Sequence, residues 1–114
     1  MQTIYAIHQP DAEKLTGVYL EMLELGAPTI RVVDCGDHYE ALEGSHRLAA
    51  AEAMGLMPTL IVYAQDDMID VTDYDWHING PWSWPDASCE AGYVAGEIHS
   101  GRSVSYSFDG MQRI

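Results

Sequence analysis

Five consecutive residues, Glu43 to Arg47 (EGSHR), carry the clearest chemical potential in the sequence, and an alanine-rich helix is predicted to begin within them. Backbone N–H groups in the first turn of a helix have no partner inside the helix, and the helix dipole adds partial positive charge there. His46 and Arg47 place two cations at that positive end, although the chain has only five Lys and Arg residues. This placement predicts a bound anion, most often a phosphate.

The same residues have an ordinary structural interpretation. Glu43 lies four residues before Arg47 and could neutralise it, and Ser45 could serve as a common N-cap. A tetrapeptide such as G-S-H-R also occurs by chance, because short motifs match many unrelated sequences. The surrounding elements therefore have to decide between the two interpretations.

Those elements form a regular series. Thr29–Val33 is β-branched and predicts a strand, Asp34–Asp37 predicts a hairpin turn, and His38–Leu42 predicts the returning strand. A helix is expected to follow through Met54, and a buried strand within Leu56–Tyr63. The strand, turn, helix and strand together predict a compact unit that presents the start of the helix.

The run LEGSHRLAAAEAMGLMPTLIV resembles the signature of the ParB/sulfiredoxin superfamily: a strand, a G-x-H/R-R turn, a small-residue helix, a glycine stop and a strand. The resemblance covers about Ile30 to Tyr63. It implies a small single-domain α+β fold with a mixed sheet and two or three helices. Residues 1–64 would be the family-like part, and residues 65–114 a divergent acidic, tryptophan-rich part.

The resemblance also implies a function. Members of the superfamily bind the phosphates of a nucleotide at this turn, and the nucleotide expected here is ATP, ADP or CTP. In an enzyme, a phosphotransferase or NTPase, Glu43, His46 and Arg47 would be catalytic, and Glu43 or Asp37 would hold Mg²⁺. The matching nucleotide-binding positions are Gly44, Ser45, His46 and Arg47. Gly44 also suits a positive φ or a close approach of backbone to phosphate.

Two activities of the superfamily are disfavoured. Ser45 stands where sulfiredoxins have a catalytic cysteine, and neither Cys35 nor Cys89 occupies that position. ParB-type DNA partition needs a helix-turn-helix region and a dimerisation segment, for which this sequence has no room. The two distant cysteines also fit neither a disulfide framework nor a zinc knuckle, so reduced, inert thiols are expected.

Four side chains in and near the turn could form a metal cluster, but their spacing matches no standard site. The cluster would comprise Asp34, Asp37, His38 and His46.

The net charge of −13 argues against broad contact with nucleic acid, and no direct nucleic-acid binding is expected. It favours recruitment of Mg²⁺ or a basic protein partner. The alternative function is therefore a non-catalytic module that senses a nucleotide or binds a basic protein, as a DNA mimic would.

No apolar run approaches the ~20 residues that span a bilayer, and no secretory signal is visible. A cytoplasmic location without a membrane partner is expected.

The rest of the chain predicts further elements. Thr3–Ile7 indicates a first strand, and Asp11 caps a helix through Leu25. Beyond residue 65 the chain is rich in Asp, and a helix is expected from Asp86 to about Ser100. Ser103–Phe108 predicts a half-exposed strand, with a tail from Gly110. Three tryptophans would either fill a small core or stack on a base: Trp76, Trp82 and Trp84.

Overall fold

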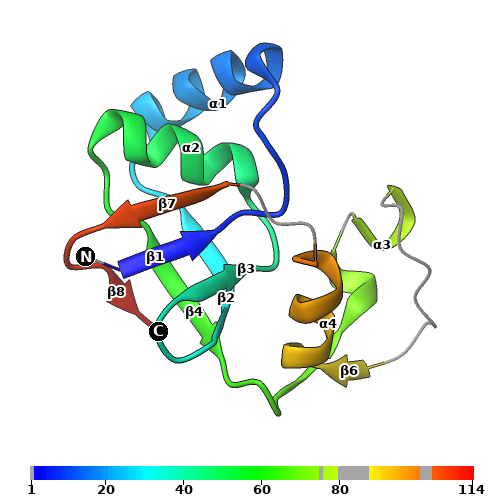
Figure 1. The fold of residues 1–114 in the computed structure, drawn as a ribbon. Helices are drawn as coiled ribbons and strands as arrows, with labels where there is room; N and C mark the ends of the chain where they lie inside the picture. The colour runs from blue at the N-terminus through cyan, green and yellow to red at the C-terminus, as the bar shows by residue number, and fades with distance from the viewer. Residues whose placement is uncertain (1, 75, 80–87, 101–103) are drawn as a thin grey trace.

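The protein is an α+β domain built on one mixed six-stranded sheet (Figure 1), as the sequence predicted. The computed structural model describes residues 2–74, 76–79, 88–100 and 104–114. The strand order is β7-β1-β3-β2-β4-β8. The strands are β1 (Gln2–Tyr5), β2 (Thr29–Asp34), β3 (Tyr39–Ala41), β4 (Thr59–Tyr63), β7 (Ser105–Phe108) and β8 (Gln112–Arg113).

Two helices lie side by side over one face of the sheet, α1 (Ala12–Leu25) and α2 (Ser45–Met54). Asp11 caps α1 by accepting the Glu13 N–H, and Gly26 follows its last residue, as predicted. The small side chains of α2 let it approach the sheet closely, and Ala50 and Ala51 are fully buried. This helical layer and the inward strand residues, such as Ile4 and Val32, form the larger hydrophobic core.

The described elements between residues 68 and 98 pack against the opposite face of the central strands β2 and β3. Two short strands pair with each other here, β5 (Met68–Asp70) and β6 (Ser88–Glu90). Three helical segments accompany them: the 3-10 helix Val71–Asp73, the single-turn helix α3 (Trp76–Asn79) and helix α4 (Ala91–Ile98). Val33 and Leu42 point to this face and pack with residues such as Val71 and Val94. A second, smaller core therefore lies opposite the first.

The parallel pairing of β1 with β3 determines where the predicted site lies. Ile4 pairs with Tyr39 and Tyr5 with Glu40, so both strands end at the same edge of the sheet. The chain then leads from β1 into the start of α1 and from β3 into the start of α2. The N-termini of α1 and α2 therefore lie together, at the end of the sheet where β1 and β3 terminate.

Three expectations about the second half need correction. Gly110 onward is not a tail, because β8 pairs in parallel with β4 and the Ile114 N–H donates to the Leu60 carbonyl at 2.7 Å. The last helix begins at Ala91 with Glu90 as its N-cap, and Asp86 lies outside the described residues. The strand β6 occupies residues assigned to that helix, because pairing with β5 overrides local helical preference.

Among the described residues, no helix has the length and apolar character needed to cross a bilayer.

Trp76 is a core residue and not an exposed stacking platform; Trp82 and Trp84 lie outside the described residues. The Trp76 ring stacks on Tyr74 at 5.1 Å, and its indole N–H donates to the Leu42 carbonyl at 2.6 Å. Trp76 therefore anchors the segment that precedes Glu43.

We expect Trp76→Phe to lower the free energy of unfolding by about 1–3 kcal/mol, because the buried Leu42 carbonyl loses its donor. Urea unfolding followed by circular dichroism measures this change. An unchanged unfolding midpoint would show that the indole hydrogen bond adds nothing to stability.

Candidate functional site

Helix α2 begins without a side-chain cap. Its N-cap is Gly44, at φ 81° in the left-handed region, and no side chain bonds to the first turn as a cap. The first helical hydrogen bond runs from the Leu48 N–H to the Gly44 carbonyl at 2.9 Å. Ser45 was expected as a possible N-cap, but it is the first helical residue and its hydroxyl accepts the Ile7 N–H at 3.2 Å.

His46 connects the starts of the two helices. Its Nε2 accepts the Asp11 N–H at 2.9 Å, so the ring proton is on Nδ1 when the imidazole is neutral. Burial lowers the pKa of His46, and the nearby His8 and Lys14 lower it further. His46 therefore acts as a neutral hydrogen-bond acceptor, and not as one of the two cations expected at the positive end of the helix.

Arg47 contacts Glu43 and the Thr29 carbonyl, but both contacts are weak. Its guanidinium lies 3.4 Å from a Glu43 carboxylate oxygen and donates to the Thr29 carbonyl at 3.2 Å. The side chain is 38% exposed. Exposed i,i+4 ion pairs of this kind contribute about 0.3–0.5 kcal/mol. The neutralisation of Arg47 by Glu43 that the sequence allowed is thus present but weak.

Glu43 is held more firmly by Arg31 of β2. The Glu43 Oε2 atom accepts from the Arg31 Nε at 2.9 Å and from the Arg31 backbone N–H at 3.3 Å. The hydrogen bond with Glu43 raises the pKa of Arg31, whose guanidinium also lies over the Tyr74 ring at 4.4 Å. One carboxylate therefore lies between two guanidinium groups, which leaves a local excess of positive charge in an acidic protein.

The structure does not bring Glu43 and Asp37 together as a Mg²⁺ pair. Asp37 precedes β3 and Glu43 follows it, so they flank opposite ends of that strand. Asp37 is 91% exposed and bonds to His38, whereas Glu43 bonds to the two arginines. Magnesium binding and catalysis by these residues stay predictions that the geometry does not support.

A shallow hollow of about 200 Å³ lies beside Arg47. Apart from Arg47 it is lined mainly by the second half of α1 and the segment after it, including Met22, Leu25 and Pro28. Its lining is largely apolar, and its volume is below the roughly 300 Å³ at which small-molecule pockets begin. It could take an apolar fragment of a ligand whose anionic part contacts Arg47.

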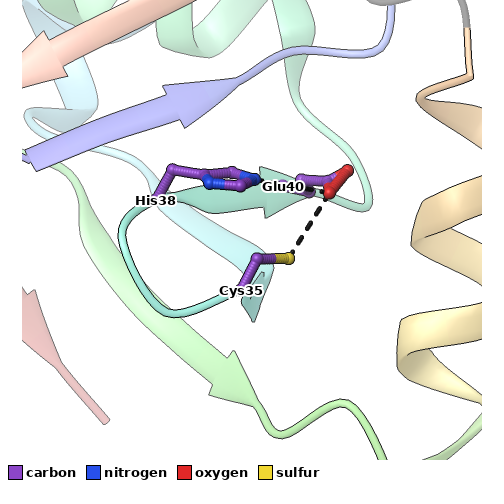
Figure 2. Close-up of side chains that lie close together, drawn as sticks. All are labelled: Cys35, His38 and Glu40. Carbon is purple, nitrogen blue, oxygen red and sulfur yellow. Dashed lines mark hydrogen bonds and ion pairs between the residues drawn. The ribbon is translucent and has the colours of Figure 1, made fainter.

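A second group of polar side chains lies at the turn between β2 and β3, and it shares only His38 with the metal cluster considered from the sequence. Cys35, His38 and Glu40 converge there (Figure 2), with one potential ligand atom from each within 4.8 Å of the others. The available signal was the spacing C-x₂-H-x-E across a predicted hairpin. It was missed because Cys35 was interpreted as an inert thiol and Glu40 as part of a strand.

Comparison with protein families, curated proteins and solved structures yields no match. The relationship to the ParB/sulfiredoxin superfamily therefore stays a prediction, and the site is interpreted from its geometry.

We expect Gly44→Ala to destabilise the protein more than Gly55→Ala. Both glycines have positive φ, 81° and 70°, so both substitutions add backbone strain of about 1 kcal/mol. A Cβ at Gly44 would also lie 2.6 Å from Ile30 Cδ1, whereas at Gly55 it meets nothing within 4 Å. Urea unfolding of both variants measures the difference, and equal losses would contradict this close packing at the start of α2.

His46 should make stability fall in mild acid. Its folded pKa is below the ordinary value of about 6.5, so on acidification the unfolded chain takes up a proton before the folded chain does. The stability is therefore fully present above about pH 6.5 and is lost as the pH falls toward the lowered folded pKa. In urea unfolding at about pH 8 and pH 5.5, wild type should lose more stability than His46→Gln. Equal losses would show that His46 is not held in its neutral form.

Proposed function

We propose that the start of α2 binds the phosphate of a nucleotide or another phosphorylated small molecule, and that the protein binds this ligand without turnover. The main support is that the first turn of α2 differs from those of α1 and α4 in how its N–H groups are capped. The Asp11 carboxylate caps α1, and α4 begins with its Ala91 and Gly92 N–H groups donating to the carbonyls of Asp67 and Gln65. The first turn of α2 has no side-chain cap, and its N-cap is a glycine.

The position of α2 in the sheet supports the proposal. Its start lies beyond the carboxyl ends of the parallel strands β1 and β3, beside the start of α1. Ligands of open α/β sheets bind beyond the carboxyl ends of strands, where backbone N–H groups and helix dipoles favour anions. Gly44 permits the left-handed turn that directs the chain into α2 at this edge.

Arg47 is the cation best placed to contact the ligand. Its ion pair with Glu43 is long and partly exposed, whereas Glu43 keeps the shorter bond to Arg31 when Arg47 moves away. A phosphate can therefore recruit Arg47 without leaving Glu43 unpaired. Charge-assisted bonds to phosphate are stronger than the exposed pair that would be lost.

Turnover receives less support than binding. A phosphotransferase or NTPase would need Glu43 as a base or as a Mg²⁺ ligand, and Glu43 is engaged by Arg31 and Arg47. His46 uses its Nε2 lone pair to hold Asp11. Both side chains stabilise the start of α2, and their contacts favour a binding module over an enzyme.

The proposal predicts a ligand-dependent rise in thermal stability that requires Arg47. ATP, ADP, CTP and GTP, each with Mg²⁺, and inorganic phosphate would be tested by thermal unfolding. A ligand at about 100 times its Kd stabilises the fold by roughly 2.7 kcal/mol, which gives a shift of several degrees. Arg47→Ala should abolish the shift. Arg113→Ala should retain it, because Arg113 is half exposed on β8 and pairs with Asp34.

No shift with any of these ligands would overturn the proposal, as would an equal shift in Arg47→Ala. If one nucleotide does bind, release of inorganic phosphate over time would show turnover and would contradict the non-catalytic part. Mg²⁺ without nucleotide is the matched blank, so that a metal effect is not mistaken for nucleotide binding.

A further inference from the structure

The three side chains at the β2–β3 turn offer three different ligand atoms on one face of the hairpin. The Cys35 Sγ lies 3.4 Å from Glu40 Oε1, and the His38 Nε2 lies 3.5 Å from the same oxygen. The side chains are partly buried, with His38 20% and Glu40 12% exposed. The group is therefore sheltered but still accessible to a small ion.

The pairing of the two strands creates this arrangement. Val33 pairs with Glu40, and alternate residues of a strand point to the same face, so His38 joins Glu40 there. The Cys35 N–H donates to the His38 carbonyl at 3.0 Å, which brings Cys35 opposite His38. The turn is closed by Gly36 at φ 97°, whose N–H donates to an Asp34 carboxylate oxygen at 2.9 Å. The backbone thus holds the three positions together before any ligand binds.

Asp37 fixes the orientation of the imidazole. Its carboxylate lies 2.6 Å from His38 Nδ1, and an ionised carboxylate can only accept a hydrogen bond. The Nδ1 atom therefore carries a proton, and Nε2 is the atom directed toward Glu40. Histidines that ligate metals usually donate their other ring N–H to a carboxylate or carbonyl in this way.

We propose that Cys35, His38 and Glu40 bind a divalent transition metal, with Zn²⁺ as the expected ion. Tetrahedral zinc with ordinary bond lengths separates a sulfur and an oxygen ligand by about 3.5 Å and a nitrogen and an oxygen ligand by about 3.3 Å. The observed separations of 3.4 and 3.5 Å match these edges. A thiolate with an imidazole selects zinc over Mg²⁺ or Ca²⁺, which prefer oxygen ligands.

Three protein ligands leave the fourth tetrahedral position for water or for a ligand atom from solution. This is the pattern of open zinc sites, whereas structural sites use four protein ligands. Binding releases the Cys35 thiol proton, and the thiolate and the Glu40 carboxylate together balance the two charges of the ion. The inference does not depend on phosphate binding at α2.

Titration of tag-free, metal-stripped protein with Co²⁺ tests the site, since cobalt reports its ligands by absorption. One equivalent of Co²⁺ should give a thiolate-to-cobalt charge-transfer band and visible bands with the intensity of four-coordinate cobalt. Zn²⁺ should displace the cobalt and remove both sets of bands. Cys35→Ser should remove the charge-transfer band, and Cys89→Ser, which changes the other free cysteine, should keep it. Asp37→Asn should weaken Zn²⁺ binding by about 10–100-fold. Azide should shift the visible bands by occupying the fourth position.

A wild-type measurement guards against a variant that does not fold. Zn²⁺ should slow the modification of Cys35 by a thiol reagent, as mapped by peptide mass, and leave Cys89 unprotected. Absence of the charge-transfer band, its persistence in Cys35→Ser or its loss in Cys89→Ser would overturn the site. Equal modification of Cys35 with and without Zn²⁺ would do the same. Visible bands that azide does not change would overturn the open fourth position.

Discussion

The antiparallel pairing of β2 with β3 is the constraint on which both candidate sites depend. These strands lie at the centre of the sheet, and their register places Val33 opposite Glu40 and Val32 opposite Ala41. At the turn end, the register brings together the thiol, imidazole and carboxylate. At the other end, the Leu42 N–H continues the pairing by donating to the Arg31 carbonyl at 2.9 Å, and the chain then enters α2. A shift by one residue would move every side chain to the other face and would destroy both arrangements.

The acidic second half of the chain supports this central pair. Trp76 bonds to the Leu42 carbonyl, and Tyr74 lies under the Arg31 guanidinium that holds Glu43. Burial raises the pKa of Tyr74, which keeps its phenol neutral beside the cation. Residues from the acidic part of the chain thus fix the residues just before α2, and the two halves of the chain form one structural unit around β2 and β3.

Local periodicity in the sequence was sufficient to predict the elements of the first half. The caps of α1, the hairpin and the bounds of α2 follow from Asp11, Gly26 and the alanine run, because these signals act over a few residues. The strands β8 and β6 were missed, since they are short and pair with β4 and β5, which lie far from them in the sequence. Short strands of this kind carry no period that a sequence pattern can reveal.

The same distinction applies to the candidate sites. The glycine turn at Gly44 could be predicted, because positive φ is a local demand. The partner of His46 lies 35 residues away at Asp11, so its neutral state could not be inferred from neighbouring residues. Cys35 and Glu40 meet through the register of β2 and β3, which the spacing C-x₂-H-x-E does not specify by itself. Sequence therefore indicated where chemistry could occur, and tertiary pairing decided which side chains share it.

Both outer strands of the sheet, β7 and β8, have features that disfavour pairing with a further strand. At one edge, the Ser107 N–H of β7 donates to a Glu52 carboxylate oxygen at 3.0 Å, so a side chain of the helical layer occupies a donor that an added strand would use. At the other edge, β8 is only two residues long and carries Arg113. Exposed, unpaired edges template intermolecular β-association. The outer strands β7 and β8, which only residues 109–111 join, should therefore resist pairing with strands of other molecules and growth into fibrils.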